Sequence, residues 1–192
     1  MSENIVGMQL LVKHAASLGH RKIAYVHGQP SAVTEKRITG YFRGMKDQGI
    51  VPCREYLVES LYDSPDDGYQ AMMRLMKLPT PPTCVLMPDD QSCLGALKAA
   101  NDLGLQVPRD VSVAGFDGSS LGQVLHPRLT SIRQDAEQIG IQAARALIEQ
   151  IRSPHVAAGE TAVIPVKLIV GNSTGPVKGQ PALVHKRCEV SV

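Results

Sequence analysis

The sequence predicts an α/β protein built on a doubly wound, mostly parallel sheet. Helical and strand signals alternate along the chain, and this alternation is typical of βαβ units. The chain has 192 residues, 43% of them hydrophobic, which is enough to bury the core of one domain. Residues 111–116 are an almost unbroken apolar run, as expected for a strand that helices cover on both faces.

The first elements are a helix, a strand and a second helix. Residues 4–18 carry apolar side chains with a period of about 3.6 residues, and Gly19 is suited to end that helix as its C-cap. Residues 22–27 form a short run with β-branched members, which favours a strand. Helical periodicity resumes over residues 34–48 and stops at Gly49. These segments predict a helix followed by one βα unit.

The same alternation continues through a domain that spans residues 4–176. Further strands are expected at 56–58, 84–87, 111–116, 129–132 and 163–170, and further helices at 66–77, 91–103 and 135–151. Gly104 follows the helix at 91–103, where a C-cap is needed. Residues 177–192 show no sustained period and predict a loose tail.

Composition and charge favour a soluble, cytoplasmic protein. Twenty Lys and Arg against eighteen Asp and Glu give a formal net charge of +2, and no dense basic run is present to neutralise a phosphate backbone. No stretch approaches the length of a membrane span, and the first residues lack the pattern of a signal peptide. The absence of CxxC spacing predicts free thiols in a reducing compartment at Cys53, Cys84, Cys93 and Cys188.

Polar side chains follow the predicted strands at the carboxyl edge of the sheet, where open parallel sheets bind ligands. Arg37 lies on the helix after the first strand, with Ser31 and Thr34 near the start of that helix. Asp89 follows the third strand and Asp117 follows the fourth. A guanidinium can hold vicinal hydroxyls or a carboxylate, and carboxylates accept hydrogen bonds from hydroxyls or amines. These residues predict a site for a small polyhydroxylated ligand.

Structural roles for the acidic residues remain open. Asp is favoured at helix N-caps and in turns, so Asp89 or Asp90 can simply cap the next helix and Asp117 can set a turn. Tyr62 and Asp63 lie in the loop after the second strand. The tyrosine ring can stack on the apolar face of a sugar, and a solvated loop tyrosine is the alternative.

No pattern in the sequence is typical of an enzyme, a metal site or a cofactor site. The six histidines lack the spacing of metal ligands, and no Gly-x-Ser-x-Gly nucleophile elbow is present. Neither GxGxxG after the first strand nor GxxxxGK[ST] occurs, which argues against a nucleotide cofactor. Binding without catalysis is therefore expected, with a small α/β enzyme as a less favoured alternative.

Four sequence blocks, taken in order, resemble the effector-binding domain of LacI/GalR-type transcriptional regulators. The resemblance covers about residues 4–174, and the blocks are 18–24 (LGHRKIA), 37–41 (RITGY), 89–96 (DDQSCLGA) and 111–135 (VSVAGFDGSS to HPRLTSIRQD). It implies that Arg37 and Asp117 contact a small-molecule effector, a sugar or a sugar derivative. Asp89 stands where the family usually has asparagine, which implies a more acidic pocket that could favour an amine.

The resemblance also implies a domain plan and partners. By analogy with the periplasmic-binding-protein-like (type I) fold, residues 20–128 and 166–174 would form the C-terminal lobe. Residues 4–18 and 130–165 would be remnants of an incomplete N-terminal lobe. Family members begin with a helix-turn-helix head, so the chain is expected to be truncated and to reach operator DNA only through a head that it lacks.

A homodimer is expected by the same resemblance, through the helix at 91–103 and a loop at 119–128. Leu121, Val124 and Leu125 place apolar groups in that loop, where polar residues would be ordinary. Burial of these side chains in their own lobe is the alternative. The runner-up function is that of a sugar-binding component of a transport system, which shares the fold.

Overall fold

A six-stranded, mostly parallel sheet forms the centre of the protein, as the sequence predicts. The computed structural model describes residues 2–152 and 162–178. The strands, in chain order, are β1 (Ile23–His27), β2 (Leu57–Glu59), β3 (Cys84–Leu86), β4 (Ser112–Asp117), β5 (Thr130–Arg133) and β6 (Lys167–Ile169). Their order across the sheet is β2-β1-β3-β4-β5-β6. Only the pairing of β6 with β5 is antiparallel.

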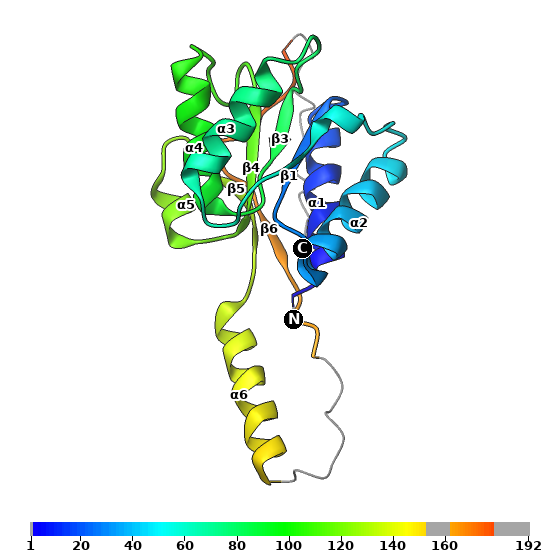
Figure 1. Ribbon diagram of the computed structural model, residues 1–192, viewed down its shortest axis with the longest axis vertical. Helices are drawn as coiled ribbons and strands as arrows, with labels where there is room; N and C mark the ends of the chain where they lie inside the picture. Colours follow the sequence, from blue (N-terminus) through cyan, green and yellow to red (C-terminus); the bar gives the residue numbers. More distant parts are fainter. Residues whose placement is uncertain (1, 153–161, 179–192) are drawn as a thin grey trace, which may run out of the picture.

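Helices cover both faces of the sheet. On one face lie α1 (Asn4–Ser17) and α2 (Ala32–Asp47), and on the other α3 (Pro65–Met76) and α4 (Asp90–Asp102) (Figure 1). A short 3-10 helix (Arg54–Tyr56) precedes β2. Side chains alternate along β1, so Ile23 and Tyr25 join the core under α1 and α2. Ala24 and Val26 join the core under α3 and α4.

Glycines set the helix ends and the closest helix contact. Gly19, Gly49 and Gly104 have φ of +90°, +62° and +71°, each two positions beyond the last residue of α1, α2 and α4, where glycine was predicted to end the helix. On α4, a Cβ on Gly95 would lie 1.7 Å from the carbonyl oxygen of Pro65. Only glycine lets α3 and α4 cross this closely.

Two elements differ from the sequence prediction. The predicted loop at 119–128 contains a short helix, α5 (Ser120–Val124), because the Ser119 hydroxyl accepts the backbone N–H of Gly122 at its start. The predicted strand at 163–170 is reduced to β6, because Pro165 cannot donate to a ladder. Upstream, Ile164 forms only an isolated parallel bridge with Ser2.

The predicted division into two lobes also differs from the structure. Met8, Leu11 and Val12 of α1 are fully buried in the same core as β1, and β5 lies inside the sheet. The segment 4–18 is thus a layer of the lobe that holds the sheet, and it is not a remnant of another lobe. In contrast, α6 (Ala136–Arg152) has no buried residue and projects from the end of the sheet (Figure 1).

A buried polar network fastens the C-terminal segment under the amino edge of the sheet. His20, which is 2% exposed, places Nε2 3.0 Å from both the Ser112 hydroxyl and the Gly175 carbonyl oxygen. His14 lies 2.9 Å from the Thr174 hydroxyl. Burial lowers the pKa of both histidines, so the neutral rings are favoured.

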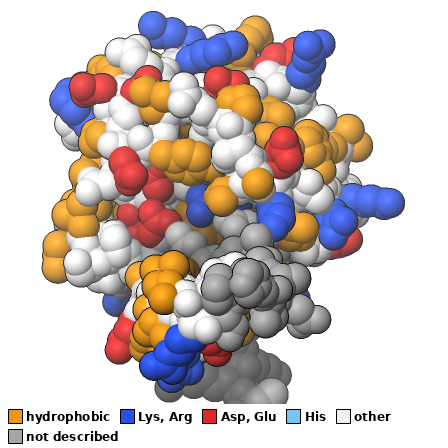
Figure 2. All heavy atoms as spheres, turned by 60° about the horizontal axis from the view of Figure 1, so that its bottom comes forward, with side chains coloured by type: hydrophobic (Ala, Val, Ile, Leu, Met, Phe, Trp, Pro, Cys, Tyr) orange, Lys and Arg blue, Asp and Glu red, His pale blue; other side chains and the backbone are white. Residues whose placement is uncertain are grey.

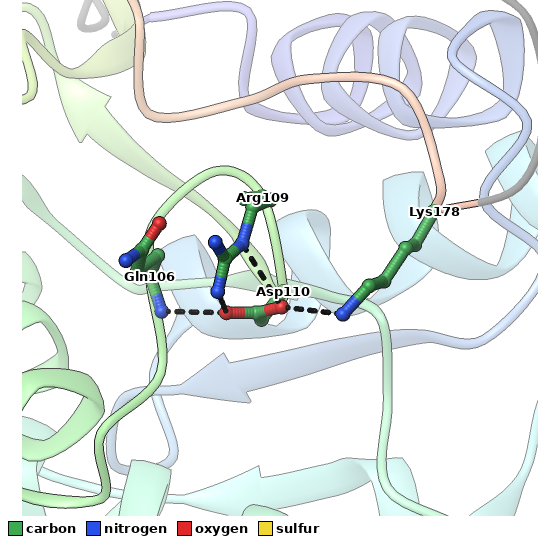
Figure 3. A network of polar contacts seen from close by, with 4 residues as sticks. All are labelled: Gln106, Arg109, Asp110 and Lys178. Atoms are coloured by element: carbon green, nitrogen blue, oxygen red, sulfur yellow. Dashed lines mark hydrogen bonds and ion pairs between the residues drawn. The ribbon is translucent and has the colours of Figure 1, made fainter.

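The same segment ends in a polar cluster at the surface (Figure 3). Asp110 accepts hydrogen bonds from the backbone N–H of Gln106 at 3.0 Å, from Arg109 at 3.1 Å and from Lys178 at 3.1 Å. These bonds hold the pKa of the Asp110 carboxyl well below its usual range. The first residues of the predicted tail are therefore anchored, and 179–192 lie outside the described residues.

Cys53, Cys84 and Cys93 are free thiols, and Cys188 lies outside the described residues. Across 2–152 and 162–178, no helix combines the length and the apolar character needed to cross a bilayer.

Candidate functional site

Arg37 is a buried cation at the carboxyl edge of the sheet. It lies on α2 and is 5% exposed. Its Nε donates to the side-chain oxygen of Asn4 at 2.8 Å, and its Nη1 donates to the carbonyl oxygen of Pro88 at 2.6 Å. Because Pro88 follows β3, the guanidinium bridges from α2 to the end of a neighbouring strand. A buried charge needs such partners to offset its desolvation.

Two aromatic rings flank the guanidinium. Its central carbon lies 3.6 Å from the centroid of the Phe116 ring on β4 and 5.7 Å from that of Tyr62. Both distances are within the range of cation–π attraction, which strengthens where water is excluded. The rings therefore help to fix the plane of Arg37.

Tyr62 is held in place by the loop after β1. Its hydroxyl lies 3.0 Å from that of Thr34, which in turn donates to the carbonyl oxygen of Gln29 at 2.8 Å. Gly28 leaves the space that the ring occupies, because a Cβ there would lie 1.9 Å from a ring carbon. Ser31 caps α2 by accepting the backbone N–H of Thr34 at 3.1 Å. Ser31 and Thr34 thus support the position of the tyrosine.

Asp89 has a capping role in the structure. Its carboxylate accepts the backbone N–H of Ser92 at 2.7 Å and the Ser92 hydroxyl at 3.1 Å, at the start of α4. It also accepts the backbone N–H of Asp63 at 2.9 Å. Asp63 has a φ of +54°, a conformation that Asp tolerates better than most residues. Asp89 therefore ties the loop of Tyr62 and Asp63 to α4.

Asp117 ends β4, is half-buried, and has one hydrogen-bond partner for its carboxylate among the described residues. One carboxylate oxygen accepts the side-chain N–H of Gln134 at 2.6 Å. Burial raises the pKa of Asp117 to about 6, against the opposing charge of Arg37 and the hydrogen bond from Gln134. The carboxylates of Asp90 and Asp89 raise it further. Such a carboxyl can change its protonation state at mild pH.

Asp90 is a functional candidate that sequence reasoning treated only as a possible cap. It is 1% exposed, and its carboxylate accepts the backbone N–H of Ser119 at 2.7 Å and the Ser131 hydroxyl at 2.6 Å. The Ser131 hydroxyl also accepts the backbone N–H of Gly118 at 3.1 Å. These bonds fix the turn that follows Asp117, the last residue of β4, which itself has a φ of +115°.

The structure brings together three of the predicted site residues: Arg37, Tyr62 and Asp117. Four others support the loops around them: Ser31, Thr34, Asp63 and Asp89. Figure 2 shows acidic and basic side chains near one another on the end of the molecule from which α6 projects. Within the described ranges, no group of three or more His, Cys, Asp or Glu could hold a metal ion. Sequence reasoning missed Asn4 and Gln134. Gln134 carries a usable signal, since it follows β5 at the same edge of the sheet.

Comparisons with known proteins give consistent results. The periplasmic binding protein-like domain family matches residues 12–174. The probable HTH-type transcriptional repressor ExuR of Bacillus subtilis (strain 168) is 35% identical over 159 residues, which are 82% of this chain and 47% of that protein. The chain spans about half the length of the curated relatives it matches.

Two solved structures show the same fold. A LacI family transcriptional regulator from Enterococcus faecium with bound ribose superposes with a TM-score of 0.82 at 27% identity, over 92% of this chain and 65% of that one. The lac repressor dimer bound to operator and the anti-inducer ONPF superposes with a TM-score of 0.80 at 29% identity, over 90% of this chain and 59% of that one. The chain therefore belongs to the periplasmic binding protein-like domain family, and its similarity covers the effector-binding region of LacI/GalR-type repressors.

Proposed function

We propose that this chain is the small-molecule-sensing part of a LacI/GalR-type transcriptional repressor, with Arg37 and Asp117 as the principal effector contacts. One observation carries the proposal. The two side chains lie at the same sheet edge, and each keeps a polar atom without a partner among the described residues: Nη2 of Arg37 and Oδ2 of Asp117. A free donor and a free acceptor are thus available at the same edge of the sheet, and their side chains are near enough for the charge of Arg37 to act on Asp117.

This pair suits a sugar or a related polyol. One ligand hydroxyl can accept from the guanidinium while another donates to the carboxylate, and the Tyr62 ring offers an apolar face. The ribose bound to the Enterococcus faecium regulator is a ligand of this chemistry. Because Asp89, Asp90 and Asp117 make the site acidic, an amino sugar is a second ligand to test.

The rest of the proposal follows from the relatives. The chain binds its ligand without catalysis and acts in the cytoplasm, and operator binding belongs to the helix-turn-helix region for which the relatives are named.

Self-association uses α4 and residues 119–128, as in a closed twofold dimer. Val124 is 79% exposed there, and an open groove between α3 and α4 is lined in part by Tyr69 and Leu94.

Backbone-resolved NMR tests the ligand site directly. D-ribose and D-glucosamine are added to the labelled chain at concentrations up to about 100 mM, because a one-sided site binds weakly. The expected shift changes cluster at Arg37, Tyr62 and Gly118, and they are lost in Asp117→Asn. The exposed Asp102→Asn is the matched control and keeps them. Shift changes elsewhere, or none with either sugar, would contradict the proposal.

A further inference from the structure

A continuous chain of hydrogen bonds joins the two principal site residues. Gln134 Nε2 donates to Asp117 Oδ1 at 2.6 Å, and Gln134 Oε1 accepts from the Ser2 hydroxyl at 2.5 Å. The Ser2 carbonyl oxygen accepts from Asn4 Nδ2 at 3.1 Å, and Asn4 Oδ1 accepts from Arg37 Nε at 2.8 Å. Asp117 and Arg37 are therefore linked through Gln134, Ser2 and Asn4, and the link between Ser2 and Gln134 joins residues 132 positions apart in sequence.

The direction of every bond in this relay is fixed by chemistry. Carboxylates only accept and guanidinium groups only donate, so the two ends determine how both intervening amides must point. Flipping the amide of Asn4 would set two donors against each other at Arg37 and two acceptors against each other at the Ser2 carbonyl, and flipping the amide of Gln134 would set its oxygen against the Asp117 carboxylate. Each amide is thus locked by its partners.

Burial makes the relay costly to break. Ser2, Asn4 and Arg37 are 6%, 4% and 5% exposed, and the two bonds of Asn4 are buried, whereas the two bonds of Gln134 are partly buried. A buried polar group that loses its partner keeps the full cost of its desolvation. Breaking the relay is therefore most costly at Asn4, where both hydrogen bonds are buried.

The relay passes through the segments at the root of α6. Ser2 pairs with Ile164, and the backbone N–H of Glu3 donates to the Ile164 carbonyl oxygen at 3.1 Å. Gln134 lies between the end of β5 and the start of α6. Figure 1 shows the start of the chain beside the segment that leads into β6.

We propose that Asn4, Ser2 and Gln134 are positioning residues of this site, which set the Arg37 guanidinium and the Asp117 carboxyl in one relative arrangement and tie it to the root of α6. In this role the three residues connect the proposed effector site to α6, and the biological meaning of that connection rests on the proposed function. The relay itself can be tested without any ligand.

The carboxyl carbon of Asp117, followed by 13C NMR through a pH titration, is the readout. The charged groups that act on Asp117 are Arg37, Asp90 and Asp89, and all three remain in every variant. Ser2→Ala removes a hydroxyl that does not touch Asp117. Because Gln134 then loses the partner that orients it, the Asp117 midpoint rises above its wild-type position, and Ser2→Thr restores it. Gln134→Leu removes the donor itself and raises the midpoint by about one pH unit.

Ser17→Ala is the matched control, because the Ser17 hydroxyl bonds only to a carbonyl oxygen of its own helix. An Asp117 midpoint in Ser2→Ala equal to that in Ser17→Ala would overturn the relay. If Gln134→Leu does not fold, Ser2→Ala alone decides. If the Asp117 midpoint shifts in Ser2→Ala but the protein does not respond to D-ribose or D-glucosamine, the proposed ligand is refuted and the relay stands. If the protein responds to a sugar but the midpoint does not shift, only the relay is refuted.

Discussion

The guanidinium of Arg37 rests on the ring of Phe116, with 3.6 Å between its central carbon and the ring centroid. Lysine cannot reproduce this flat stack together with two directed hydrogen bonds. Arg37→Lys is therefore expected to lower the free energy of unfolding by about 2 kcal/mol, as measured by urea denaturation. Arg43→Lys, at an exposed position of the same helix, is expected to stay within about 0.5 kcal/mol of wild type. Equal losses in the two variants would contradict the stacking role.

Asp117 is expected to reduce stability at neutral pH. Its pKa is raised from 3.8 to about 6, so between these values the folded state binds more protons than the unfolded state. Stability then falls as the pH rises through this window. Asp117→Asn keeps an acceptor for Gln134 and removes the charge, so it should gain about 1 kcal/mol at pH 7 and little at pH 4. A variant less stable than wild type at pH 7 would show that the carboxylate is needed for folding.

Buried His20 and partly buried His14 give the opposite dependence on pH. Burial lowers the pKa of His14 and His20, so below their ordinary value of 6.5 the unfolded state binds more protons. Stability is expected to fall as the pH drops from 7 toward 5. The measurement uses Asp117→Asn as background, which removes the opposing carboxyl. Amide hydrogen exchange should then increase first at residues 171–178, and exchange that rises uniformly would contradict the local role of these rings.

The crossing of α3 and α4 permits a sharp test of packing. Gly95→Ala would place a Cβ 1.7 Å from the Pro65 carbonyl oxygen, so a loss of about 3 kcal/mol is expected. Gly140→Ala is the matched control, because nothing lies within 4 Å of a Cβ at that position of α6. There the change should raise the helix content of α6, worth up to about 1 kcal/mol, by circular dichroism. Similar losses at both glycines would show that the close contact at Gly95 does not explain the result.

Self-association is best tested at Val124. Leu125 packs partly against the core under α3 and α4, so a charge there would also disturb folding. Val124 is exposed, and Val124→Glu is expected to convert a dimer into a monomer by light scattering, with an unchanged circular dichroism spectrum. A second exposed site, Val51→Glu, should leave the dimer intact. A wild-type chain that scatters as a monomer would refute the proposed dimer.

Local pattern was enough to predict most elements of the fold. Periodicity and C-cap glycines placed α1, α2 and α4 within two residues of their ends, because those signals are local. The rule that ligands bind at the carboxyl ends of strands brought Arg37 and Asp117 to one edge. The sequence could not show that the Asp89 carboxylate already accepts the backbone N–H of Asp63, because that hydrogen bond depends on a loop 26 residues away in sequence.

The sequence could not predict the long-range hydrogen bonds, nor which apolar side chains would stay exposed. The bond between Ser2 and Gln134 joins residues 132 positions apart, and nothing in either neighbourhood indicates the other. The apolar period of α6 is as regular as that of a buried helix, so periodicity alone could not show that Leu147 and Ile151 are exposed.

The projecting helix α6 acts geometrically as a lever arm. Its 17 residues span about 25 Å at about 1.5 Å per residue. A rotation of about 10° at its root, where Gln134 lies, moves its far end by roughly 4 Å. A small change in angle near the site residues thus becomes a displacement about as large as a side chain at the far end of α6. A neighbouring structure would gain or lose a contact there.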